Sequence, residues 1–174
     1  MLLNKKLLLN ICNIAIEAGN EILKFYNSEI EVTHKDDLSP LTKADLVSNR
    51  IILDSLKNLD SDIIPVLSEE SLVEWSLRKN WSKYWLVDPL DGTKEFIKKN
   101  GEFTVNIALI ENNNPILGVI FAPAKSALYL AQKNFGSFKI NTKLKLDNLD
   151  GCTKILVSNQ SDNVRIIGSR SHSN

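Results

Sequence analysis

The sequence has little cysteine, little histidine and no excess of either charge. Its 174 residues include two cysteines and two histidines, and 21 Lys and Arg balance 21 Asp and Glu. Without a net charge, no global field favours nucleic acid, so we expect no nucleic acid polymer as a partner. Cys12 and Cys152 lie far apart in the sequence with no CxxC motif. This spacing favours two reduced thiols over a disulfide or a metal site.

Long apolar runs are also absent. The most apolar N-terminal stretch, MLLNKKLLLNICNIAIEAG, is interrupted by lysines and asparagines. Nothing in the sequence approaches the roughly 18 uninterrupted apolar residues of a membrane span. The stretch also lacks the small-residue cleavage site of a signal peptide. We therefore expect no transmembrane segment and a cytoplasmic location.

The hydrophobic pattern predicts helices first and strands afterwards. Apolar residues recur at steps of three and four over residues 5–26, which predicts an amphipathic helix. A second helix is expected to begin after Thr42 as its N-cap, with Leu46, Leu53 and Leu56 facing the core. The predicted strands lie within residues 63–71, 84–88, 102–111, 116–122, 127–132, 154–160 and 165–171. This order predicts one α+β domain with a largely antiparallel sheet.

Acidic side chains follow two of these strands. Glu69 and Glu70 come after the first, and Asp88 and Asp91 flank a turn after the second. If the two strands are neighbours, their carboxyl ends bring these carboxylates together. Charges so close repel, and a metal cation, a basic residue or solvent would have to compensate them. Oxygen ligands from separate loops are those that Mg²⁺ prefers, and the Leu90 carbonyl would add another.

The same turn leads into an anion-binding candidate. Gly92 and Thr93 open the run TKEFIKK, whose first backbone N–H groups are available to an anion if the run is helical. A cation and a helix start together would hold a phosphate. The alternative is structural, because Asp-x-x-Asp-Gly is also a common capped turn and an isolated Glu-Glu pair is usually solvated. The residues alone leave both open.

The string WLVDPLDGTKEF, preceded by VLSEES, resembles the signature of the Mg²⁺-dependent, lithium-sensitive phosphatases of the inositol monophosphatase family. The segments KDDLSPLTKAD and SRSH resemble the branch of this family formed by the 3'(2'),5'-bisphosphate nucleotidases. The resemblance covers essentially the whole chain. It implies the N-terminal part of the layered α/β/α/β/α sugar-phosphatase fold. Family members carry a further segment with a Trp-Asp metal ligand, so we expect residues 1–174 to be a single, incomplete domain whose C-terminal portion is missing.

The resemblance also implies a role for each motif residue. The implied metal ligands are Glu69, Asp88, Asp91 and the Leu90 backbone oxygen. Asp45 would hydrogen-bond the Thr93 hydroxyl so that the pair activates the attacking water, and Glu70 would hold a water at the metal or beside it. The implied substrate contacts are Glu69, Leu90, Asp91, Gly92, Thr93, Ser169 and His172.

The implied activity is Mg²⁺-dependent conversion of 3'-phosphoadenosine 5'-phosphate to AMP and phosphate, which clears a by-product of sulfate assimilation. The partner would be this small nucleotide bisphosphate. A divalent cation is required because a phosphate dianion repels carboxylates. The alternatives are an inositol monophosphatase-type sugar phosphatase and a truncated, inactive remnant with binding capacity only. Peripheral attachment on the cytoplasmic side of the inner membrane is the alternative location.

The missing segment bears on the last two predicted strands. We expect Ile155, Val157, Ile166 and Ile167 to be buried, partly by that segment in a complete fold. Without it they would form an exposed apolar patch. Such patches promote association, so we expect this chain to self-associate and to hydrolyse substrate poorly.

Overall fold

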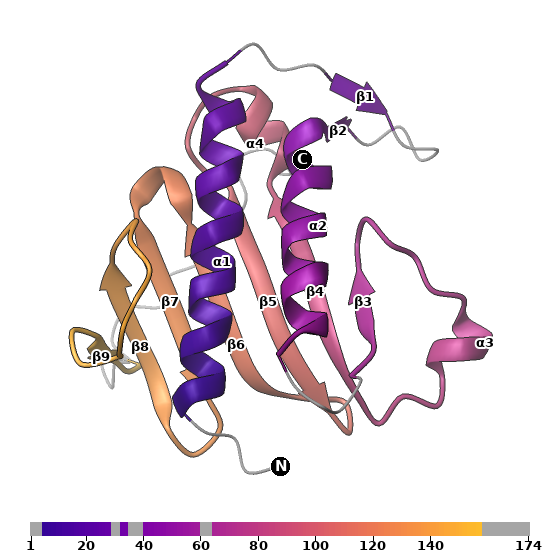
Figure 1. Cartoon of the computed structure of the whole chain (residues 1–174), viewed down its shortest axis with the longest axis vertical. Coiled ribbons are helices and arrows are strands. Elements are labelled where there is room, and N and C mark those ends of the chain that lie inside the picture. The colour runs from indigo at the N-terminus through magenta and orange to yellow at the C-terminus, as the bar shows by residue number, and fades with distance from the viewer. Residues whose placement is uncertain (1–4, 29–31, 35–39, 60–63, 158–174) are drawn as a thin grey trace, which may run out of the picture.

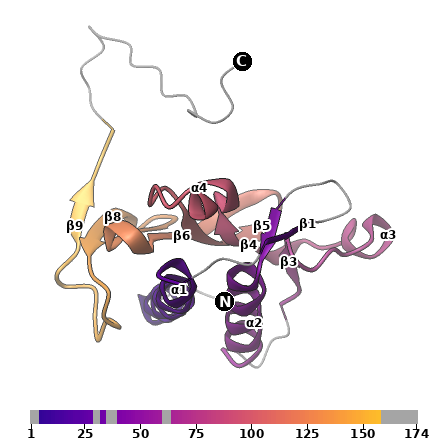
Figure 2. The same ribbon diagram turned by 90° about the horizontal axis from the view of Figure 1, so that it is seen from above.

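Two long helices lie on one face of a seven-stranded sheet (Figures 1 and 2). The computed structural model describes residues 5–28, 32–34, 40–59 and 64–157. The sheet order is β3-β4-β5-β6-β7-β8-β9, in which β3 is parallel to β4 and each later pair is antiparallel. The predicted α+β class with a largely antiparallel sheet is confirmed.

The helices are α1 (Lys5–Tyr26), α2 (Lys43–Lys57), α3 (Trp75–Arg78), α4 (Thr93–Ile97) and the 3-10 turn η1 (Pro123–Lys125). The two long helices begin at the predicted residues, whereas α3 and η1 were not predicted. The strands of the sheet are β3 (Val66–Ser68), β4 (Lys83–Asp91), β5 (Thr104–Glu111), β6 (Asn114–Ala122), β7 (Ala127–Gln132), β8 (Gly136–Asn141) and β9 (Thr153–Ile155). A separate pair consists of β1 (Val32–His34) and β2 (Pro40–Thr42). In the part of the chain described here, no helix has the length and apolarity of a membrane span.

Helix α1 packs on the middle of the sheet because its apolar residues form one face. Ile11, Ala15 and Ala18 on this face have no exposed surface. Gly19 is where the helix comes closest to β6, since a Cβ there would lie 2.5 Å from the Phe121 ring. The helix predicted over residues 5–26 is confirmed at both ends.

Helix α2 is rotated relative to the prediction. Thr42 is its N-cap, as expected, and Leu56 is buried. Leu46, however, is 50% exposed, and Leu53 is only partly buried. The residues that face the sheet are Ala44, Asp45, Ser48, Asn49, Ile52 and Leu56. The assignment of Leu46 to the core was wrong because buried hydrogen bonds of the polar residues on this face set the rotation of the helix.

The predicted strands are largely confirmed, with β5 the clearest case. Phe103, which precedes β5, and Val105, Ile107 and Leu109 within it are at most 1% exposed, as their alternation predicted. Strand β8 was not predicted; all but its last residue are partly buried, so no alternation marks it. Strand β9 is the last in the sheet order and is shorter than the predicted 154–160.

The exposure expected for the apolar residues at the end of the sheet is found for two of them. Ile155 is 38% exposed and Val157 is 91% exposed. Among the described residues, strand β9 pairs with β8 alone, and all three of its residues are exposed. The predicted strand 165–171, with Ile166 and Ile167, lies outside the described residues, as do Ser169 and His172.

Candidate functional site

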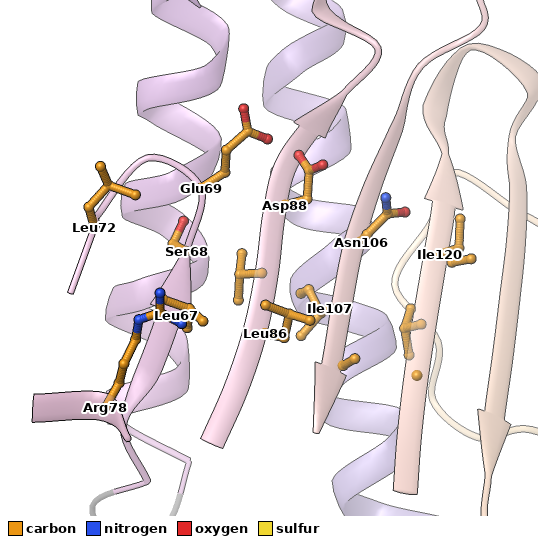
Figure 3. Close-up of a pocket in the computed structure, with 14 residues that line it drawn as sticks. Leu67, Ser68, Glu69, Leu72, Arg78, Leu86, Asp88, Asn106, Ile107 and Ile120 are labelled. Carbon is orange, nitrogen blue, oxygen red and sulfur yellow. The ribbon is translucent and has the colours of Figure 1, made fainter. Parts of the chain in front are cut away.

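The acidic residues come together because β3 and β4 are parallel neighbours. Ser68 pairs with Val87 at the carboxyl end of β3, and the Glu69 N–H donates to the Val87 carbonyl at 3.2 Å. The side chains of Glu69 and Asp88 therefore lie beside each other at this end of the sheet (Figure 3). The predicted juxtaposition of these two strand ends is confirmed.

Asp88 carries the clearest electrostatic signal of the site. Burial, and then the negative charges of Glu69 and Asp91, raise its pKa from 3.8 to about 7, although a hydrogen bond from the Leu90 N–H lowers it. The Asp88 Oδ1 atom is buried and has no hydrogen-bond partner among the described residues. A carboxylate in this state is destabilised when charged, and a cation would relieve it.

The turn between Asp88 and Asp91 is held by neutral hydrogen bonds. The register between β4 and β5 shifts between these two aspartates. The Ser48 hydroxyl donates to the Pro89 carbonyl at 2.7 Å. The Asn106 amide donates to Asp91 Oδ2 at 3.1 Å. These two bonds fix the turn, and neither of them brings a positive charge to the aspartates.

Gly92 and Thr93 lie where the turn enters α4. Gly92 has φ = +91°, and a Cβ there would lie 2.8 Å from the Glu102 carbonyl, so glycine is required. The helix is shorter than the predicted run TKEFIKK and ends at Ile97. It ends there because Lys99 adopts φ = +57°, and the Asn100 N–H then reaches back to the Glu95 carbonyl at 3.3 Å.

Asp45 and Thr93 meet across 48 residues of sequence, as predicted. The Thr93 hydroxyl lies 3.1 Å from Asp45 Oδ1 and 3.3 Å from the Leu90 carbonyl, to either of which it donates. The other oxygen of Asp45 accepts from the Thr42 N–H at 2.8 Å and the Thr42 hydroxyl at 2.5 Å. Burial raises the pKa of Asp45 above its ordinary value, and the bonds from Thr42 and Thr93 partly oppose this. The Asp45 carboxylate is thus held with one oxygen on Thr93.

The prediction missed three polar residues that bind the acidic turns. Ser48 and Asn49 follow Asp45 by three and four residues, so they lie on the same face of α2. That spacing could have identified Ser48 and Asn49 as buried, but the prediction placed the leucines of the helix on the buried face instead. Asn106 is paired with Asp88 across β4 and β5. Its sequence signal was a polar residue within an otherwise apolar alternation.

The chemistry of these residues fits Mg²⁺, although a complete ligand cluster is not assembled. Within the described residues, no three Asp, Glu, His or Cys side chains converge closely enough to hold an ion. The potential donors are all oxygen atoms, and the partnerless Oδ1 of Asp88 is one of them. Glu69, Asp88, Asp91 and the Leu90 carbonyl are the groups that would hold the ion.

A cavity of about 710 Å³ adjoins the acidic residues (Figure 3). Glu69, Asp88 and Asn106 line one end of it, and Leu72 and Ile120 belong to its apolar part. The side chains that line this cavity lie on the sheet face opposite the two long helices (Figure 3), and Ile120 among them is 46% exposed. The site therefore combines carboxylates, a tight glycine turn and an open apolar wall.

The fold is that of a known protein family. The model of the inositol monophosphatase family matches residues 4–173. The chain therefore belongs to the inositol monophosphatase family, which confirms the resemblance drawn from its motifs.

The relatives include a specific branch of this family. The 3'(2'),5'-bisphosphate nucleotidase CysQ of Escherichia coli O6:H1 is 52% identical over 123 residues, which make up 70% of this chain and 50% of that protein. The crystal structure of CysQ from Bacteroides thetaiotaomicron matches with a TM-score of 0.77 at 35% identity, covering 93% of this chain and 62% of that one. An inositol monophosphatase/NADP phosphatase solved with Mg²⁺ and phosphate shares the fold, with a TM-score of 0.61 at 20% identity over 71% of this chain and 46% of that one. The chain spans about half the length of the curated relatives it matches.

Proposed function

We propose that this chain contributes the acidic turns and the Asp45–Thr93 pair of a Mg²⁺-dependent phosphatase that converts 3'-phosphoadenosine 5'-phosphate to AMP and phosphate. The observation that carries the proposal is the hydrogen bond between Thr93 and Asp45 beside the crowded carboxylates of Glu69 and Asp88. The 52% identity to a protein named 3'(2'),5'-bisphosphate nucleotidase supports the choice of substrate. A family structure solved with Mg²⁺ and phosphate supports the choice of metal.

The protein groups would activate water and direct its proton. Mg²⁺, when bound, would neutralise the substrate phosphate and lower the pKa of the attacking water. The Thr93 hydroxyl donates to Asp45, so its oxygen is free to accept a hydrogen bond from that water. As the water oxygen attacks phosphorus, its proton passes through Thr93 to Asp45, and the bond to the ribose 3'-oxygen breaks. The leaving oxygen takes a proton from solvent. Glu70 would hold a further water beside the metal.

Backbone groups at the start of α4 would receive the phosphate. Gly92 lets the chain pass close to the Glu102 carbonyl, where a Cβ would lie only 2.8 Å away, and we propose that N–H groups of this turn bind the phosphate. These would act together with the metal rather than as a helix terminus alone, because α4 has only five residues. The substrate contacts that we propose are Glu69, Leu90, Asp91, Gly92, Thr93, Ser169 and His172.

Two further features belong to this proposal. We place the protein in the cytoplasm, where its free cysteines Cys12 and Cys152 would stay reduced. The comparisons give no support to peripheral attachment at the inner membrane. Inhibition by Li⁺ is expected because the proposed metal site belongs to a lithium-sensitive family.

A panel of substrates tests the proposal. Phosphate release by residues 1–174 would be measured from 3'-phosphoadenosine 5'-phosphate, NADP and inositol 1-phosphate, with Mg²⁺, with Li⁺ added, and with EDTA. We expect release to be slow but dependent on Mg²⁺ and fastest with the bisphosphate. Preference for inositol 1-phosphate would favour the sugar phosphatase instead. No release from any of the substrates by a chain that still binds Mg²⁺ would favour a remnant with binding capacity only.

A further inference from the structure

The two adjacent glutamates of the site occupy the middle of a tight turn. The Ser71 N–H donates to the Ser68 carbonyl at 3.2 Å, so Glu69 and Glu70 are the two central residues of a four-residue turn. The negative charge of Glu69 also raises the pKa of the neighbouring Asp88. A turn that carries this charge needs restraint from elsewhere in the fold.

Asn49 of α2 spans both ends of this turn. The Ser68 hydroxyl donates to Asn49 Oδ1 at 2.7 Å, and Asn49 Nδ2 donates to the Ser71 hydroxyl at 3.1 Å. The Ser68 hydroxyl also accepts from the Glu70 N–H at 3.3 Å. Asn49 is 8% exposed and Ser68 is 1% exposed. Bonds that are buried in this way compete little with water and therefore hold the turn well.

An asparagine side chain suits this position for chemical reasons. Its amide has a carbonyl oxygen that accepts from the Ser68 hydroxyl and an NH₂ group that donates to the Ser71 hydroxyl, and it carries no charge. An aspartate would add a third carboxylate beside Glu69 and Glu70. A leucine of similar size would leave the buried Ser68 hydroxyl without this partner, which is unfavourable.

We propose that Asn49 is a positioning residue of the phosphatase site, which clamps both ends of the Ser68–Ser71 turn and thereby sets where the Glu69 and Glu70 carboxylates stand. The effect of this clamp on Mg²⁺ affinity rests on the proposed function. The restraint of the turn by Asn49 does not. The order of the turn and the Mg²⁺ affinity are therefore measured separately.

The test compares two Asn→Ala variants of the whole chain. Asn49→Ala removes the clamp. Asn13→Ala is the matched control, because Asn13 of α1 also makes two hydrogen bonds to a distant segment, the loop between β8 and β9. It donates to the Leu146 carbonyl at 2.9 Å and accepts from the Leu146 N–H at 2.7 Å. Amide hydrogen exchange reports the order of the turn, and calorimetric titration with Mg²⁺ reports its affinity. If Asn49→Ala does not fold, Ser71→Ala is measured in its place, because it removes one of the two hydrogen bonds of Asn49.

We expect the amides of residues 69–71 to exchange about tenfold faster in Asn49→Ala than in Asn13→Ala. The Mg²⁺ affinity should fall about 10- to 100-fold in Asn49→Ala and stay unchanged in Asn13→Ala, as for other residues that orient metal ligands. Equal exchange and equal affinity in the two variants would overturn the proposal. If the unsubstituted chain takes up no Mg²⁺, the assigned metal site is wrong, and exchange alone decides on the clamp: faster exchange confined to the turn supports it, and unchanged exchange refutes it.

Discussion

Replacing Asp88 by asparagine should make the metal-free protein more stable and its Mg²⁺ binding weaker. The pKa of Asp88 is raised from 3.8 to about 7 by burial and by the charges of Glu69 and Asp91. A shift of this size corresponds to about 4 kcal/mol at most. Because Asp88 is only half-buried, solvent screening reduces this, and we expect about 1–2 kcal/mol. Asparagine removes the charge at nearly the same volume, so the variant should gain that amount at pH 8.

The pH dependence of this effect has a defined sign. A carboxyl whose folded-state pKa is raised binds its proton more tightly in the folded state, so the folded protein loses stability as the pH rises from about 4 to 7. Above pH 7 the whole penalty is present. The Asp88→Asn variant should lack this loss. Since Mg²⁺ binds the charged carboxylate, binding by the unsubstituted chain should also release a proton below pH 7, and binding by the variant should release less.

Thermal unfolding between pH 4 and pH 8, without metal, measures the first effect. A gain of 1–2 kcal/mol should raise the melting temperature at pH 8 by about 3–6 °C and leave it unchanged at pH 4. Calorimetric titration with Mg²⁺ measures the second effect. Asp54→Asn, at an exposed position of α2, is the control and should change neither. A variant of Asp88 that melts no higher at pH 8 and binds Mg²⁺ as well as the unsubstituted chain would refute the reasoning.

Three further outcomes are expected. Thr93→Ala should lower phosphate release by at least about tenfold while leaving the calorimetric Mg²⁺ affinity nearly intact, because Thr93 is not among the proposed metal ligands; an equal loss of both would contradict its role. Gly19→Ala should destabilise the fold by about 1–3 kcal/mol in denaturant unfolding, because the added Cβ would lie 2.5 Å from the Phe121 ring; unchanged stability would show that the ring moves freely. The purified chain should self-associate in light scattering through the sheet face on which Leu86 and Ile120 are 43% and 46% exposed; Ile120→Lys should reduce this, and a monodisperse unsubstituted chain would refute it.

Sequence periodicity predicted those elements whose burial is one-sided. Helix α1 and strand β5 each present one apolar face to the core, so their patterns carry the full signal. Strand β8 has residues of intermediate burial on both faces and therefore shows no period. In α2 the apolar pattern was misleading, because half of its buried face consists of polar residues with partners far away in the sequence.

Only those residues of the candidate site that belong to sequence motifs could be predicted. The acidic residues and the Asp45–Thr93 contact followed from the motif resemblance and from the parallel strand ends. The hydrogen bonds of Asn49 join residues 19 and 22 positions apart. That of Ser48 reaches 41 positions along the chain. No local pattern contains such information, because an asparagine or serine in a helix is more often exposed than buried.

Helix α2 holds together the segments that carry the acidic residues of the site. Three polar residues on one face each bind a different segment: Asp45 binds Thr93 of α4, Ser48 binds the Pro89 carbonyl, and Asn49 binds the Glu69–Glu70 turn. Each bond uses a backbone or hydroxyl group, so none of them neutralises the carboxylates that would bind the ion. An apolar face on this helix would pack as well against the sheet, but it would leave the three segments free to move apart under their own charge. The polar face therefore serves the arrangement of the site rather than the stability of the core. Hydrogen exchange of the turn and titration with Mg²⁺ measure the first, and unfolding measures the second.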